Sequence, residues 1–168
     1  MTDAAGEMDT VYIETSIVSH ATARPSTDPR VSVLQDQAKQ WWMNERPKYR
    51  LVTSQFVLDE ASLGDPEAAA RRLEMLADIP VLLPEARVEE IANKLVLRSL
   101  MPETAKLDAL HVASAAVAGV KYLLTQNCRH IANAHILPRV YDLLKEFGLS
   151  RMLICTPAEF LGDPNDES

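Results

Sequence analysis

The chain has 168 residues, of which 47% are hydrophobic and 24% charged, and its formal net charge is −7 at pH 7. A chain of this length fits one domain with a substantial core. The acidic balance argues against a protein that coats nucleic acid non-specifically, since such binding depends on neutralising phosphates with lysine and arginine. An enzyme that holds a few nucleotides beside a divalent cation remains compatible with it. No apolar run approaches the roughly 18 residues of a membrane-spanning helix, so no membrane association is expected.

The two ends of the chain are predicted to lie outside the folded domain. The start, MTDAAGEMDT, is acidic and lacks the basic and apolar segments of a signal peptide, so residues 1–9 are expected to form a disordered lead. Residues 10–162 would form a single domain, and residues 163–168 an acidic tail. The two cysteines, Cys128 and Cys155, have no metal-type spacing and are expected to be reduced, as in a cytoplasmic protein.

Short runs of apolar and β-branched residues, typical of strands, alternate along the chain with segments of helical periodicity. In chain order the sequence predicts a strand at 10–13, a helix at 31–45, a strand at 49–54, helices at 54–62 and 66–78, a strand at 79–84, a helix at 84–100, a helix from Pro102 or Thr104 to Gly119, a strand at 121–125, a helix at 139–147 and a strand at 152–156. This alternation predicts an α/β fold with a parallel sheet covered on both faces.

One predicted helix carries an acid among apolar residues. In AKLDALHVASAAV, residues 105–117, successive residues rotate by about 100°, so Asp108 shares its face with Ala105, Val112 and Ala115. A lone buried carboxylate costs several kcal/mol unless it is paired, protonated or bound to a cation. The pattern therefore predicts a partner or a cation beside Asp108, although an acid near a helix start also interacts favourably with the helix dipole.

Further oxygen ligands are expected at the carboxyl ends of the strands, where open parallel sheets bind ligands. Glu14 follows the first predicted strand and Asn127 the fourth. On the helix at 54–62 the apolar spacing turns Glu60 inward and Asp59 towards solvent. The sequence thus predicts that Glu14, Glu60 and Asp108 converge at one end of the sheet, with Asn127 beside them.

Three carboxylates in one crevice repel one another unless protons or a cation intervene. Hard oxygen ligands without a cysteine or histidine cage favour Mg²⁺ or Mn²⁺ over Zn²⁺. Such ions activate water and stabilise the charge that develops on a phosphodiester under attack, so the constellation indicates a metal-dependent phosphodiesterase. Each residue alone also has a structural explanation: Glu60 could pair with a lysine or arginine, Glu14 could end a strand, and Asn127 could form a turn. Only their joint placement favours the metal site.

The remaining polar and aromatic residues are expected to have ordinary roles. His130 and His135 lie five residues apart on a predicted loop and make no familiar metal pair. His111 is expected to flank the Asp108 face as a polar helix residue, with contact to RNA as the alternative. Trp41 and Trp42 are adjacent and face different directions, so one is expected in the core and the other partly exposed.

The sequence resembles the PIN-domain family, and within it the VapC-type toxins of prokaryotic toxin–antitoxin pairs. The matching segments, in the family's order, are VYIETSIVS (11–19), SQFVLDEASLGDPEAAARRLEML (54–76), KLDALHVASAAVAGVKYLLTQNCRHIANA (106–134) and ICTPAEFL (154–161). The resemblance implies a three-layer, PIN-like (Rossmannoid) α/β fold with a central parallel β-sheet flanked by helices. It also implies an acidic pocket that binds Mg²⁺ or Mn²⁺, and an endoribonuclease inhibited by a cognate antitoxin.

Carried over position by position, the resemblance places Glu14, Glu60, Asp108 and Asn127 at the family's four catalytic, metal-binding positions. Two of them depart from the family's pattern. The first position is usually aspartate, and Glu14 is one methylene longer; the fourth is often aspartate, and Asn127 carries no charge.

The resemblance further implies an RNA substrate, an antitoxin partner and a homodimer. Arg24, Lys106 and Arg129 lie near the matched segments and would be available to RNA phosphates. A second hypothesis is a degenerate PIN domain that binds RNA or a protein without cleaving. A third hypothesis, a nucleotide-binding Rossmann module, is disfavoured because the chain has no G-x-G-x-x-G motif and only 5 glycines.

Overall fold

A four-stranded parallel sheet with the order β2-β1-β3-β4 organises the chain. The computed structural model describes residues 7–161. Its strands are β1 (Thr10–Ile13), β2 (Arg50–Val52), β3 (Tyr122–Leu124) and β4 (Leu153–Cys155). In the central strand, Tyr12 pairs with Val52 on one side and Leu123 on the other. The sheet confirms the predicted α/β fold.

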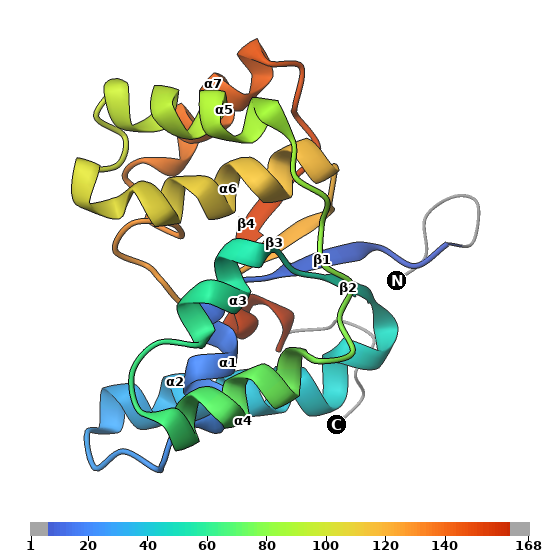
Figure 1. The fold of residues 1–168 in the computed structure, drawn as a ribbon, viewed down its shortest axis with the longest axis vertical. Helices are drawn as coiled ribbons and strands as arrows, with labels where there is room; N and C mark the ends of the chain where they lie inside the picture. The colour runs from blue at the N-terminus through green and yellow to red at the C-terminus, as the bar shows by residue number, and fades with distance from the viewer. Residues whose placement is uncertain (1–6, 162–168) are drawn as a thin grey trace.

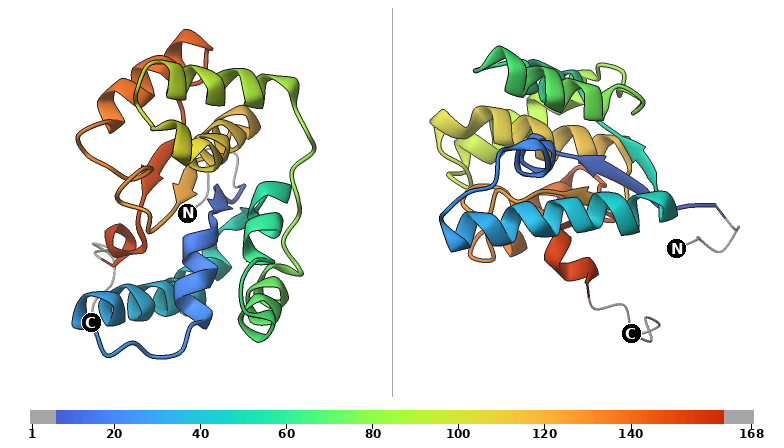
Figure 2. Two further views of the ribbon diagram at one scale, coloured as in Figure 1. Left: turned by 60° about the vertical axis from the view of Figure 1, so that its left-hand side comes forward. Right: turned by 90° about the horizontal axis from the view of Figure 1, so that it is seen from below.

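Seven α-helices flank this sheet in the part of the chain that the structure describes. They are α1 (Thr15–Thr22), α2 (Pro29–Gln40), α3 (Gln55–Ala61), α4 (Pro66–Leu76), α5 (Ala86–Leu97), α6 (Lys106–Ala118) and α7 (Leu137–Glu146). Figure 1 and the left view of Figure 2 show α5, α6 and α7 on one side of the sheet and α1, α2 and α4 on the other. None of these seven helices has the length and apolar character needed to cross a bilayer.

Helix α1 has no counterpart in the sequence prediction. It begins because Glu14, extended at the end of β1, accepts a hydrogen bond from the Ser16 backbone N at 2.9 Å and so caps the first turn. Ile17 and Val18 then pack into the core with no exposed surface. Tertiary burial thus overrides the weak helix propensity of a segment rich in threonine, serine and β-branched residues.

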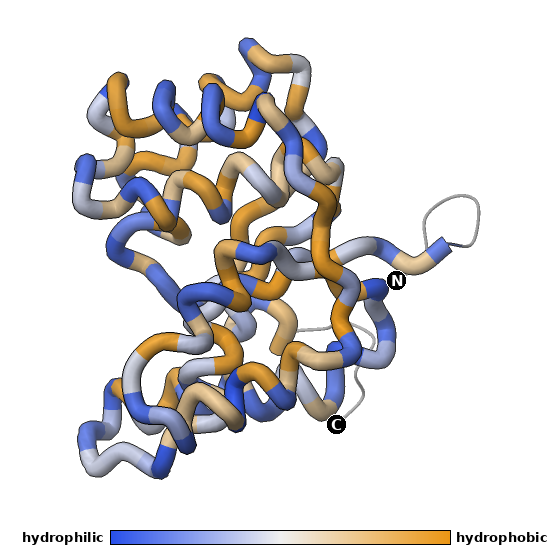
Figure 3. Tube along the Cα trace, in the orientation of Figure 1, coloured by the Kyte–Doolittle hydropathy of each residue, from blue (hydrophilic) through white to orange (hydrophobic). Residues whose placement is uncertain are grey.

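The prediction of a strand at 79–84 is wrong, except that one residue of this segment forms a bridge to the sheet region. Residues 79–85, here named the strap, run in extended form from α4 to α5, and only Val81 forms a parallel bridge, with Thr53. Thr53 donates its backbone N–H to Pro80 O at 3.0 Å, and its carbonyl accepts from Leu82 N at 2.9 Å. Pro80 and Pro84 have no N–H to continue the ladder. Figure 3 shows the apolar residues of this outer segment.

The ends of the predicted domain lie partly outside the described residues. Residues 1–6 and 162–168, which include most of the expected lead and all of the expected acidic tail, are not described. The backbone already pairs at Asp9, whose carbonyl accepts a hydrogen bond from Arg50 N at 2.9 Å.

A cluster of aromatic side chains packs around Trp41 in the core. Trp41 has no exposed surface, stacks on Tyr49 at 6.1 Å between ring centres, and meets the edge of Phe160 at 5.9 Å. Trp42 is half-buried, with the Arg46 guanidinium 4.5 Å from its ring centre. The prediction that one tryptophan is in the core and the other partly exposed is confirmed.

Gly119 ends α6 in the left-handed region, with φ of 71°. Gly119→Ala is expected to cost about 1 kcal/mol of unfolding free energy, because a side chain disfavours this backbone conformation. The loss would come from the backbone alone, since an added Cβ meets no atom within 4 Å. Urea unfolding measures it, and Gly119→Asn should lose less because asparagine tolerates this conformation better. An alanine variant as stable as the wild type would contradict the expectation.

Candidate metal centre

The first residue of the site along the chain is Glu14, which directly follows the carboxyl end of β1. Its backbone N donates a hydrogen bond to Leu124 O at 3.1 Å. The side chain is only 3% exposed. Its Oε1 accepts from the hydroxyls of Ser16 and Thr125, each at 2.5 Å, and its Oε2 accepts from Ser16 N at 2.9 Å. Each carboxylate oxygen has about two lone-pair positions. Oε1 is therefore fully used, and one position on Oε2 remains.

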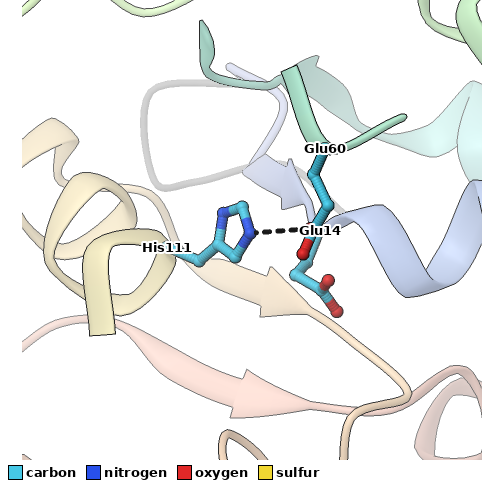
Figure 4. Close-up of side chains that lie close together, drawn as sticks. All are labelled: Glu14, Glu60 and His111. Carbon is cyan, nitrogen blue, oxygen red and sulfur yellow. Dashed lines mark hydrogen bonds and ion pairs between the residues drawn. The ribbon is translucent and has the colours of Figure 1, made fainter. Parts of the chain in front are cut away.

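Glu60 reaches the same place from the last turn of α3, and His111 from α6 (Figure 4). One ligand atom from each of Glu14, Glu60 and His111 lies within 4.8 Å of the others. Glu60 Oε1 is 3.1 Å from His111 Nε2. Asp59 is exposed and accepts a hydrogen bond from Gln55 Nε2 at 2.8 Å. The helical spacing therefore assigned the inward and outward acids of α3 to the correct sides.

The Glu60 carboxylate is held in its charged form. Burial opposes ionisation, but the hydrogen bond with His111 and the neighbouring Thr15 hydroxyl outweigh it, so the pKa of Glu60 lies below its ordinary value. Thr15 lowers the pKa of Glu60 by lying near its carboxylate and not through a well-formed hydrogen bond, because the buried Thr15 Oγ1 has no hydrogen-bond partner in the described structure.

Asp108 lies in the first turn of α6 and is half-buried. Burial raises the pKa of Asp108 above its ordinary value, and the like charge of Glu14 raises it further. His111, His130 and the Asn127 side chain act in the opposite direction. Asp108 therefore lies close enough to Glu14 and His111 to respond to their charges, although it is not among the three residues whose ligand atoms lie within 4.8 Å of one another.

Asn127 has a structural task in the turn after β3. Its Oδ1 accepts a hydrogen bond from His130 N at 3.0 Å, and its own backbone N donates to Thr125 Oγ1 at 3.0 Å. Its amide side chain also lies beside Asp108, where it lowers the pKa of that carboxyl. Asn127 thus orders the turn next to the acids.

This donor set fits a hydrated divalent cation. Two carboxylates whose oxygens lie within 4.8 Å of each other, with a third acid nearby, are mutually repulsive without positive charge between them. The buried Thr15 hydroxyl without a partner is the kind of group that a water molecule of such an ion would satisfy. Oxygen donors of this kind suit Mg²⁺ or Mn²⁺.

The sequence prediction missed the position of His111. The residue has no exposed surface, so neither a solvent-facing place on α6 nor a contact with RNA is open to it. Its spacing of three residues from Asp108 was the available signal, since such residues share one side of a helix. Of the three basic residues proposed for RNA, Lys106 pairs with Glu89 at 3.3 Å, while Arg24 and Arg129 are exposed.

The four-stranded parallel sheet and its flanking helices define a PIN-like α/β fold. No protein-family model and no curated protein sequence matches the chain. Among solved structures, it is similar to VapC20 of Mycobacterium tuberculosis, a sarcin–ricin loop cleaving toxin, at 23% identity over 67% of this chain and 86% of that chain, with a TM-score of 0.51. This likeness shows that the protein has the VapC-like form of the PIN fold.

Two complexes superimpose less closely. VapBC2 of Rickettsia felis, bound to a DNA fragment from its promoter, is 14% identical over 88% of this chain and 98% of that chain, with a TM-score of 0.49. VapBC-1 of nontypeable Haemophilus influenzae is also 14% identical, over 89% of this chain and 98% of that chain, with a TM-score of 0.49.

Proposed function

We propose that this protein is a Mg²⁺- or Mn²⁺-dependent endoribonuclease, and that it is the toxin of a toxin–antitoxin pair. The observation that carries the proposal is the approach of two carboxylates, the buried Glu14 and the partly exposed Glu60, to within 4.8 Å at the end of a parallel sheet. The raised pKa of Asp108 marks a third acid in the same electrostatic neighbourhood. Such an arrangement is costly for folding alone and is useful around a cation.

The lone pairs that remain free on each side chain would determine how that residue binds the cation. Glu60 and Asp108 would hold the cation directly, and Glu14 would use the remaining position on Oε2. Asn127 would orient a ligand water through its amide. A bound Mg²⁺ or Mn²⁺ supplies activation of water and stabilisation of the charge on the phosphodiester. We assign the exposed Arg24 and Arg129 to RNA phosphates, and the cytoplasm is the location that goes with this proposal.

The toxin proposal also includes an antitoxin and a homodimer. A groove of about 770 Å³ lies between α3, the strap and α6, and apolar side chains such as Phe56 and Leu110 line much of it. Leu83 of the strap is 85% exposed at its edge. We assign this surface to protein contact, because contiguous exposed apolar patches are unusual on monomeric proteins.

One observation favours the alternative, a PIN domain that binds RNA or a protein without cleaving. Glu14 already accepts three hydrogen bonds and caps α1. A carboxylate engaged in this way contributes fewer oxygens to a cation. Under this alternative the acids retain the shape of the site without its activity.

An RNA cleavage assay separates the two. The wild type is expected to cleave RNA with Mn²⁺ and to stop on addition of EDTA. Asp108→Asn and Glu60→Gln should each lose at least about 100-fold, since even the outer-shell partners of metal ligands are worth about 10–100-fold. Asp59→Asn is the matched control: Asp59 adjoins Glu60 but is exposed, and its loss should leave cleavage unchanged. A wild type that binds RNA without cleaving it would favour the alternative, and cleavage that persists in both active-site variants would refute the site.

A further inference from the structure

A chain of hydrogen bonds, buried except for its partly buried last bond, connects the start of α3 to Glu60 in its last turn, by way of β1 and α6. Tyr12 Oη lies 2.6 Å from Ser54 Oγ and 2.9 Å from His111 Nδ1. On its other side, His111 Nε2 lies 3.1 Å from Glu60 Oε1. Tyr12 and His111 have no exposed surface, and Ser54 is 3% exposed. Solvent therefore does not compete for the two bonds of Tyr12, whereas the bond between His111 and Glu60 is only partly buried.

The direction of the chain follows from counting protons. Ser54 Oγ accepts from Val57 N at 3.3 Å, so its hydroxyl proton needs another acceptor, and among the described residues Tyr12 Oη provides it. Tyr12 then donates to His111 Nδ1, which leaves the imidazole proton on Nε2, facing the Glu60 carboxylate.

The opposite direction leaves groups unsatisfied. If Nδ1 carried the proton and donated to Tyr12, then Tyr12 would donate to Ser54, and the Ser54 proton would have no acceptor in the described structure. A bare Nε2 would also face a carboxylate oxygen at 3.1 Å, with two acceptors in contact. Unsatisfied groups in a buried site are destabilising.

We propose that Ser54, Tyr12 and His111 form a relay that fixes the Glu60 carboxylate, with His111 donating from Nε2 as a positioning residue and not as a metal ligand. This inference rests on the proposed function. A protonated Nε2 has no lone pair for a cation. The histidine nitrogen that lies within 4.8 Å of the two carboxylates is thereby removed from the ligand set, which becomes all oxygen and suits Mg²⁺ or Mn²⁺.

Glu60 needs such a partner more than the other acids. It lies at the carboxyl end of α3, where the helix dipole disfavours negative charge. Its side chain is 30% exposed and, apart from His111, accepts no hydrogen bond within ordinary distance from a described residue. The relay engages Oε1 and leaves Oε2 for the cation, in the manner of the outer-shell partners that orient metal ligands.

Nitrogen-15 NMR of the metal-free protein tests the direction of the relay. We expect the His111 spectrum of the wild type to show a protonated Nε2 and a bare Nδ1. In Tyr12→Phe the Nδ1 resonance should shift as it loses its donor, whereas Tyr122→Phe, on the neighbouring strand, should leave it unchanged. A proton on Nδ1, a doubly protonated ring, or no shift in Tyr12→Phe would overturn the proposal.

Mn²⁺ affinity, measured from melting temperature against metal concentration, tests the positioning role. His111→Leu removes the donor and should weaken Mn²⁺ binding by about 10–100-fold. His111→Gln can donate its amide N–H from nearly the same place and should recover most of the affinity. Ser114→Ala, one turn along α6 and also buried, is the control and should bind as the wild type.

The outcomes distinguish the relay from the function on which it rests. If His111→Leu binds Mn²⁺ as firmly as the wild type, the positioning role is wrong while the metal site stands. If the wild type gains no stability from Mn²⁺ and cleaves no RNA, the proposed function fails and the positioning role falls with it. The metal-free spectrum then still decides the direction of the hydrogen bonds.

Discussion

Asp108→Asn should make the metal-free protein more stable, because it removes a carboxylate that the fold penalises. The pKa of Asp108 is raised by burial and by Glu14, so the folded state binds its proton more tightly than the unfolded state. Stability from this group is therefore present below the ordinary pKa of aspartate and is lost as the pH rises through the raised value. The gain in Asp108→Asn should appear near neutral pH and vanish in acid.

The helix dipole acts in the opposite direction, and thermal melts decide between the two effects. An acid in the first turn of α6 gains about 0.3–1 kcal/mol from the dipole, which would lower its pKa. Burial and the like charge of Glu14 raise the pKa of Asp108, and we expect these two effects to be stronger than the dipole. Thermal melts in EDTA from pH 4 to pH 8 measure the difference, and a variant less stable than the wild type at pH 7 would contradict it.

The same substitution should abolish the response to metal. At ten times Kd, Mn²⁺ stabilises the folded state by about 1.4 kcal/mol, which for a chain of this length is about 3–5 °C in Tm. The wild type and Asp59→Asn should show this shift, and Asp108→Asn should lose most of it. Equal shifts in all three proteins would exclude Asp108 from the site.

Trp41→Ala should cause the largest loss of stability of any change considered. The ring has no exposed surface and contacts Tyr49 and Phe160. Its removal leaves a cavity that its neighbours fill only in part, at a cost of about 3–5 kcal/mol. Denaturant unfolding gives the value directly.

Two variants control this prediction. Trp41→Phe keeps much of the buried area and removes an indole Nε1 that has no hydrogen-bond partner in the described structure, so its loss should be clearly smaller. Met43→Ala changes a side chain that is 76% exposed and should stay within about 0.5 kcal/mol of the wild type. A similar loss in Met43→Ala and Trp41→Ala would show that the aromatic cluster is not the source.

Sequence periodicity predicted the strands and helices in which buried residues recur at a regular spacing. Alternating strands and helices gave the parallel sheet, and helical spacing separated Glu60 from Asp59 because both lie on one continuous helix. Helix α1 escaped prediction because its stability comes from one cap and from burial against distant elements. The strap was wrongly predicted to be a strand because an apolar run between two prolines resembles one, although most of the strap lacks a pairing partner.

The acids of the site could be proposed from strand ends and helix faces, but the role of His111 could not. That role depends on its hydrogen bonds with Tyr12, 99 positions earlier, and with Glu60, 51 positions earlier. Periodicity within α6 reveals which side a residue occupies, but not which groups the fold brings against that side. Such pairings become visible only in three dimensions.

The dispersal of the site along the chain has a consequence for protein synthesis. Glu14 is held by Thr125, 111 positions later, and β1 has β3 as one of its neighbours in the sheet. The ribosome delivers the chain from the N-terminus at about 5–20 residues per second, so the first acid emerges many seconds before the hydroxyl that holds it. A polypeptide interrupted before β3 lacks both that hydroxyl and one side of the central strand. A chain that ends before β3 therefore cannot assemble the proposed site, which is completed only once residue 125 has been synthesised.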